Sequence, residues 1–158
     1  MYENDDFFEE LEAIYELASK YRPIIRNHCK DGNIKAIVDI LEREPLLKKS
    51  GGTSYIMIAC NHNHFNILEY LMNYFDENYF NKRENNIFND FCRKNNINAI
   101  KNIIKITAKN KHVINFNINE YREYGAWGEY IGPIITQVKN PVILSYLVSC
   151  GAGMKKLI

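Results

Sequence analysis

Cysteine and histidine are the residue types in this chain best suited to metal binding or nucleophilic catalysis. Cys60, His62 and His64 lie close together, but a structural zinc site takes four ligands and no second pair with suitable spacing follows them. His28 adjoins Cys29, yet consecutive residues of a helix point in different directions. We therefore predict no metal site and interpret the cysteines as small core residues.

Other catalytic patterns are equally weak. Gly51 and Gly52 form a glycine pair, but the G-K-[ST] that completes a phosphate-binding loop does not follow. Carboxylates cluster only near the N-terminus, without an apolar pocket around them. We predict that the chain is not an enzyme and has no cofactor. An enzyme with its site in the segment 109–130 is the remotest alternative.

The composition limits the kinds of partner that the chain can have. A net charge of +1, with 46% hydrophobic and 25% charged residues, gives no general attraction to nucleic acid or to an anionic membrane. We interpret the basic cluster Lys101, Lys105, Lys109 and Lys111 as a solvated face. No run approaches the roughly 18 apolar residues of a membrane span, and the acidic residues 1–6 are unlike a signal peptide. With no C-x-x-C pair, we expect reduced thiols and a cytoplasmic protein.

The positions of three cysteines point to an internal repeat. Cys29, Cys60 and Cys92 are separated by 31 and 32 residues, and each precedes a polar turn and an apolar quartet. The spacing i, i+1, i+4, i+5 places each quartet on one face of a helix. Shorter apolar helices are expected before them, at about 23–30, 54–61, 87–93 and 133–138. The four quartets are Ala36-Ile37-Ile40-Leu41, Ile67-Leu68-Leu71-Met72, Ala99-Ile100-Ile103-Ile104 and Ile143-Leu144-Leu147-Val148.

The chain resembles the ankyrin repeat family at these positions. In the second repeat, Gly52 takes the place of the family's turn glycine, residues 54–57 stand where T-P-L-H is usual, and Asn63-His64 replace the Gly-His turn. The last repeat ends in Cys150-Gly151-Ala152-Gly153, which is similar to H-G-A-D. The resemblance covers roughly residues 21–153. It implies stacked helix pairs whose finger tips and first helices bind another protein.

The repeats also depart from the family pattern. His28, Phe91 and Gln137 occupy positions where the family has a small alanine. The fourth repeat is shorter between its helices, and Pro141 begins the second of them. We expect helix packing that is less regular than in consensus repeats. The composition, rich in Asn, Ile and Lys, resembles that of ankyrin proteins from large DNA viruses or from AT-rich intracellular microbes.

An amphipathic helix is predicted at residues 5–20, before the first repeat. Its apolar stripe is Phe7, Leu11, Ile14, Ala18 and Tyr21, and its other face is largely acidic. We interpret it as a cap packed on the first repeat, since solenoid ends expose apolar surface unless they are covered. The alternative is an acidic helix that docks on a partner. The C-terminus has no comparable cap.

A long segment separates the third and fourth quartets. This insertion, at about 109–130, contains Tyr124, Tyr130 and the chain's only tryptophan, Trp127. Tyrosine and tryptophan dominate the energetics of many interfaces. Two interpretations stand side by side: a projecting finger with aromatic anchors, or a plug that fills a gap between irregular repeats.

The sequence thus predicts an all-α chain, an α-solenoid of about four ankyrin-like repeats in a single domain 1–158. The repeats are placed at about 21–50, 51–82, 83–108 and 131–153. The expected function is that of an intracellular adaptor or host-directed protein. It is expected to bind another protein through its concave face and a finger at 119–130, as a monomer or weak homo-oligomer. A self-assembling protein acting through its uncapped C-terminal end is the alternative. Carried over from the finger tips and first helices of the resembled family, the expected contact residues are Thr53, Tyr55, Met57, Asn85, Asn89, Tyr124, Trp127 and Tyr130.

Overall fold

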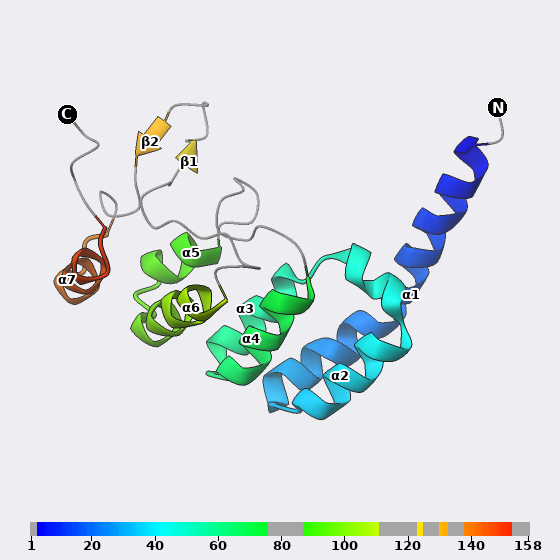
Figure 1. Ribbon diagram of the computed structural model, residues 1–158, viewed down its shortest axis with the longest axis horizontal. Coiled ribbons are helices and arrows are strands. Elements are labelled where there is room, and N and C mark those ends of the chain that lie inside the picture. Colours follow the sequence, from blue (N-terminus) through cyan, green and yellow to red (C-terminus); the bar gives the residue numbers. More distant parts are fainter. Residues whose placement is uncertain (1–2, 76–86, 111–122, 125–129, 133–137, 153–158) are drawn as a thin grey trace. The chain divides into compact units, whose positions relative to one another are not determined.

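The computed structural model describes residues 3–75, 87–110, 123–124, 130–132 and 138–152. The chain divides into two compact units, residues 1–77 and 78–158, and each is described by itself (Figure 1). Apart from one short antiparallel strand pair, all regular elements in the described ranges are helices. The expectation of an all-α chain is therefore confirmed.

The N-terminal unit contains four α-helices and a short 3₁₀ helix among its described residues. Its first α-helix, α1, is followed by three shorter ones, and α1 packs against α2, α3 and η1, while α3 packs against α4. Because α1 is in contact with most of the unit, it is the element on which the others are arranged. The elements are α1 (Glu3–Asp31), α2 (Ile34–Arg43), η1 (Pro45–Ser50), α3 (Thr53–Asn61) and α4 (Phe65–Tyr74).

Helix α1 corrects the predicted division of this region into two helices. Residues 5–20 and 23–30 belong to one continuous helix, although Pro23 lies inside it. Proline removes one helical hydrogen bond and crowds the preceding turn, so it usually ends or kinks a helix. Here Tyr21 and Ile25 are buried on either side of Pro23, which itself is exposed. Packing of both flanking residues on the same unit accounts for the continuity.

The predicted turns between paired helices share one geometry. The N–H groups of Asn33, His64 and Asn96 donate to carbonyl oxygens five residues earlier, each at 2.9 Å. The residue before each donor has a positive φ: 77° at Gly32, 59° at Asn63 and 57° at Asn95. The hydrogen bond and the positive φ together form a Schellman motif, which ends a helix with Gly or Asn in the left-handed conformation. The 31- and 32-residue spacing seen in the sequence is thus a spacing of equivalent turns.

Asparagine side chains begin three of the quartet helices. The Asn33 side chain accepts a hydrogen bond from the N–H of Ala36 at 3.2 Å, and the Asn96 side chain accepts one from Ala99 at 3.1 Å. Asn140 caps the last helix in the same way, through the N–H of Val142 at 2.9 Å. These contacts satisfy N–H groups that a helix start leaves unpaired.

The quartets form the core of each unit. The second quartet is buried in full, and the first and third are buried except at Ala36 and Ile104, which are partly exposed. Cys29, Cys60 and Cys92 are buried beside them, as expected for small core residues. Phe91 is also buried, so the third pair accommodates a phenyl ring where an alanine is usual in the resembled family.

The C-terminal unit contains α5 (Ile87–Arg93), α6 (Ile97–Lys109), β1 (Glu123–Tyr124), β2 (Tyr130–Gly132) and α7 (Pro141–Ser149). The antiparallel strands pair Glu123 with Gly132 and Tyr124 with Tyr130. In α7, Ile143 and Leu147 are buried, whereas Val142 and Val148 are 65% and 54% exposed. The fourth quartet is therefore only partly covered. The helix expected before it, including Gln137, falls almost wholly outside the described residues.

Candidate interaction surface

The most unusual exposed surface of the N-terminal unit lies on the first turns of α1. Phe7, Phe8, Leu11 and Tyr15 are 57%, 65%, 46% and 74% exposed. We call these four residues the α1 patch. At 100° per residue they fall within about one third of the helix circumference, so they form one continuous apolar face. Large apolar side chains gathered in this way usually mark an interaction site.

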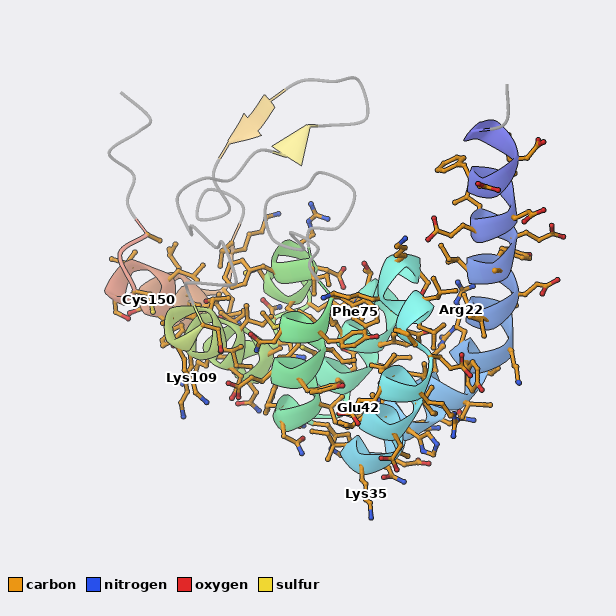
Figure 2. The ribbon with its side chains drawn as sticks, turned by 45° about the vertical axis from the view of Figure 1, so that its right-hand side comes forward. Arg22, Lys35, Glu42, Phe75, Lys109 and Cys150 are labelled. Atoms are coloured by element: carbon orange, nitrogen blue, oxygen red, sulfur yellow. The ribbon has the colours of Figure 1, made fainter. Side chains whose placement is uncertain are left out.

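The α1 patch continues the stripe that holds α1 to its own unit. Ala18, Tyr21 and Ile25, further along the same face, are buried against the rest of that unit. Ile14, between the two sections, is partly exposed. Figure 1 shows the first turns of α1 extending beyond the other helices of this unit, and Figure 2 shows that the side chains of these turns stand clear of those helices. One face of the helix is therefore core at one end and surface at the other.

This arrangement corrects the predicted capping role of residues 5–20. Ala18 and Tyr21 pack as a cap would, and η1 contacts α1 as far as Glu10 through the Lys49–Glu10 ion pair. Phe7 and Leu11, both in the predicted buried stripe, lie at the surface. The periodicity of the sequence correctly predicts which residues share one apolar face of α1. It cannot predict how much of that face the neighbouring helices cover.

Of the contact residues predicted on α3, the structure places one in the core. Tyr55 is 2% exposed, and its ring centroid lies 6.2 Å from that of Phe75, a residue labelled in Figure 2. Burial raises the pKa of the Tyr55 hydroxyl, while the nearby Arg22 guanidinium acts in the opposite direction. Tyr55 is thus a packing residue in this fold. Thr53 and Met57 are partly exposed and remain accessible in part.

For the other predicted contact residues, the structure describes the secondary structure of three, and two lie outside the described ranges. Asn89 lies on α5, and Tyr124 and Tyr130 pair between the antiparallel strands β1 and β2, near the end of the predicted insertion. Asn85 and Trp127 lie outside the described residues. The structure brings Tyr124 and Tyr130 together through their backbones.

Three of the cysteines are buried in the core, and two histidines contact backbone carbonyl oxygens. Burial raises the pKa of Cys29, Cys60 and Cys92 from the ordinary 9.0 to about 12, so these thiols stay protonated at neutral pH. His64 contacts the carbonyl oxygen of Lys30 through Nε2 at 3.0 Å, and His62 contacts that of Ile58 through Nδ1 at 3.0 Å. Within the described ranges, no group of three His, Cys, Asp or Glu side chains could hold a metal ion.

An open groove of about 540 Å³ runs between α6 and α7 of the C-terminal unit. Lys101 lies over the ring of Tyr146, with 5.3 Å from its Nζ to the ring centroid, and this cation–π contact forms part of the groove wall. The rest of the lining comes from exposed residues of α7: Pro141, Val142, Ser145 and Ser149. The groove is shallow and has a partly apolar lining, so it suits contact with a surface better than enclosure of a small molecule.

No helix among the described residues is both long and apolar enough to cross a membrane. Comparison of the chain with protein-family models, with curated proteins and with solved structures finds no match.

Proposed function

We propose that this chain is a protein–protein interaction module built from ankyrin-like helix pairs, acting inside a cell as an adaptor or a host-directed binding protein. Support for the repeat architecture comes from the three equivalent turns at Gly32, Asn63 and Asn95 and from the buried quartets that follow them. In α-solenoids, such pairs stack and present extended surfaces to partners. We infer that all four helix pairs stack in one solenoid.

The single observation that carries the binding function is the exposed α1 patch. A soluble helix normally buries its apolar face, and leaving Phe7, Phe8 and Leu11 in water forgoes about 25 cal/mol for each Å² that could be buried. A partner that covers these side chains recovers that free energy. Secondary contact candidates are Thr53 and Met57 on α3, assigned to the concave face, and Tyr124 and Tyr130 on the paired strands of the insertion.

Affinity capture from a eukaryotic cell lysate tests this function. The baits are the wild type, a Phe7→Ala/Leu11→Ala variant, a Tyr124→Ala/Trp127→Ala variant, and Ile24→Ala as a matched control. Ile24 is 41% exposed on α1 but lies on another side of the helix. We expect a protein that is retained by the wild type and by Ile24→Ala and is lost with Phe7→Ala/Leu11→Ala. Loss only with Tyr124→Ala/Trp127→Ala would move the site to the insertion, and equal retention by all baits would refute both sites.

Self-assembly is a second candidate, favoured by the exposed Val142 and Val148 on α7. Apolar side chains at the last helix of a repeat array can pair with another chain. If this is the function, the wild type grows in size with concentration and a Val142→Ser/Val148→Ser variant stays monomeric. A wild type that remains monomeric throughout the concentration series excludes it.

A further inference from the structure

The apolar face of α1 has the spacing of a helix-pairing seam. Phe7, Leu11, Ile14, Ala18, Tyr21 and Ile25 alternate steps of four and three residues, the pattern by which one helix packs along another. Phe8 and Tyr15 widen this seam on one side, as is usual in helical bundles. The C-terminal half of the seam, from Ala18 to Ile25, is buried against the chain's own unit. The N-terminal half has the same spacing, but Phe7 and Leu11 are exposed there.

The electrostatic character of this region is strongly one-sided. Residues 3–20 carry seven carboxylates and one basic side chain, Lys20. By helical angle, Asp5 and Glu12 border one edge of the α1 patch. Asp6 and Glu10 lie toward the other edge, where Glu10 forms an ion pair with Lys49 of the same unit. A helix that packs on the patch therefore has acidic side chains on both of its flanks.

Like charge argues against a second α1 helix as the occupant. Paired helices lie about 8–10 Å apart, which is no more than the Debye length of about 10 Å at 0.1 M ionic strength. Repulsion between two such acidic segments is therefore only partly screened. The same geometry attracts lysine and arginine side chains on a partner helix, where opposite charges across a seam set the choice of partner.

We propose that the α1 patch pairs with a basic amphipathic helix of a different protein, whose apolar stripe covers Phe7, Leu11 and Tyr15 and whose Lys or Arg side chains face the flanking carboxylates. This inference rests on the proposed binding function and names the chemistry of the partner. Recognition is of the helix-to-helix kind, with anchors at i, i+4 and i+8. The charges speed encounter and select the partner, and the aromatic side chains provide most of the affinity.

Three synthetic helical peptides test the pairing against the full chain by fluorescence anisotropy. The first has an apolar heptad stripe flanked by lysines, the second has the same stripe flanked by glutamates, and the third has the composition of the first with the stripe scrambled. We expect the first peptide to bind at least about tenfold more tightly than either of the others, and added salt to weaken it. Equal binding of the lysine and glutamate peptides, or no binding of the lysine peptide, overturns the proposal.

Variants of the chain locate the binding site. Phe7→Ala/Leu11→Ala should weaken the lysine peptide about tenfold or more, and Glu12→Gln/Asp5→Asn should weaken it less and reduce its salt dependence. Ile24→Ala should leave the affinity unchanged. Equal losses with Ile24→Ala and with Phe7→Ala/Leu11→Ala would overturn the assignment to the α1 patch.

Two further measurements separate the other occupants. Growth of the wild type with concentration that Phe7→Ala/Leu11→Ala abolishes would mean that a second copy covers the patch. Binding to phosphatidylcholine vesicles that is stronger than binding to the lysine peptide would mean a lipid surface. Either result overturns a basic helix as the occupant. Capture of a partner through Phe7 and Leu11 without binding of the lysine peptide would refute this inference alone and leave the proposed function standing.

Discussion

Gly52 shows how one small residue sets the packing of the N-terminal unit. It lies directly before α3, and a Cβ atom added there would come within 2.3 Å of Cδ2 of Phe75. Phe75 is buried and packs on Tyr55, so its ring has little room to move. The glycine that the sequence places in a turn is therefore needed for a close approach between the start of α3 and the end of α4.

A Gly52→Ala substitution should lower the free energy of unfolding by about 1–3 kcal/mol, because overpacking displaces the Phe75 ring. Urea denaturation followed by circular dichroism measures the change. Ser54→Ala, at an exposed position two residues later, serves as the control and should be nearly neutral. In a Phe75→Leu background the cost of Gly52→Ala should shrink. An undiminished cost in that background would contradict the proposed clash.

The three repeat cysteines should be chemically silent in the folded chain. Their pKa values of about 12 leave almost no thiolate at pH 8, whereas Cys150 is partly exposed. Alkylation by iodoacetamide followed by mass spectrometry should modify Cys150 first, and all four cysteines only in denaturant. Rapid modification of Cys60 under native conditions would contradict its core placement.

The same pKa shifts make stability depend on alkaline pH. The thiol pKa values are raised in the folded state, so between pH 9.0 and about 12 the folded chain holds more protons than the unfolded chain. The contribution of these thiols to the free energy of unfolding is therefore fully present below about pH 9, and it decreases as the pH rises above that value. A urea midpoint that stays constant through this range, or rises, would contradict the burial of the thiols.

At the scale of elements, the helix pairs follow from short-range sequence features. The quartets, the Gly or Asn turns and the asparagine caps each act within a few residues, so their positions could be predicted. The continuity of α1 could not, because Pro23 signals a break and only the packing of Tyr21 and Ile25 on the unit overrides it.

The quartet helices should respond strongly to truncation. Leu71→Ala removes a fully buried side chain from α4 and should cost about 2–5 kcal/mol of the free energy of unfolding, as should Ile103→Ala in α6. Asn66→Ala, at an exposed position of α4, is the matched control. Denaturation curves in urea measure all three variants. A loss below about 1 kcal/mol at Leu71 would argue against a well-packed core.

Helix α1 should behave differently at its two ends. Phe7→Ala/Leu11→Ala should change stability by only about 0.5 kcal/mol or less, because both side chains are largely exposed, whereas Ile25→Ala should cost about 2–5 kcal/mol. The comparison uses the same urea curves. A large loss from the double substitution would mean that residues 3–17 act as a buried cap after all.

At the scale of the whole molecule, the proposed interaction surface is the feature that the sequence predicts least well. The sequence of residues 5–20 predicts an acidic helix with an aromatic stripe, for which docking on a partner is the alternative to capping. Whether that face is covered depends on how far η1 and its neighbours reach along α1, a three-dimensional property that no local pattern encodes. The burial of Tyr55, a predicted contact residue, has the same kind of cause, since its ring packs on Phe75.

The central claim is that α1 binds a protein through its exposed apolar face, and photo-crosslinking tests it most directly. A photoreactive phenylalanine analogue is placed at Leu11, in the α1 patch, or at Glu16, on the opposite, exposed side of the same helix. After irradiation in cells, we predict a discrete protein adduct from position 11 and none from position 16. Identical adducts from both positions, or none from position 11, would contradict the claim.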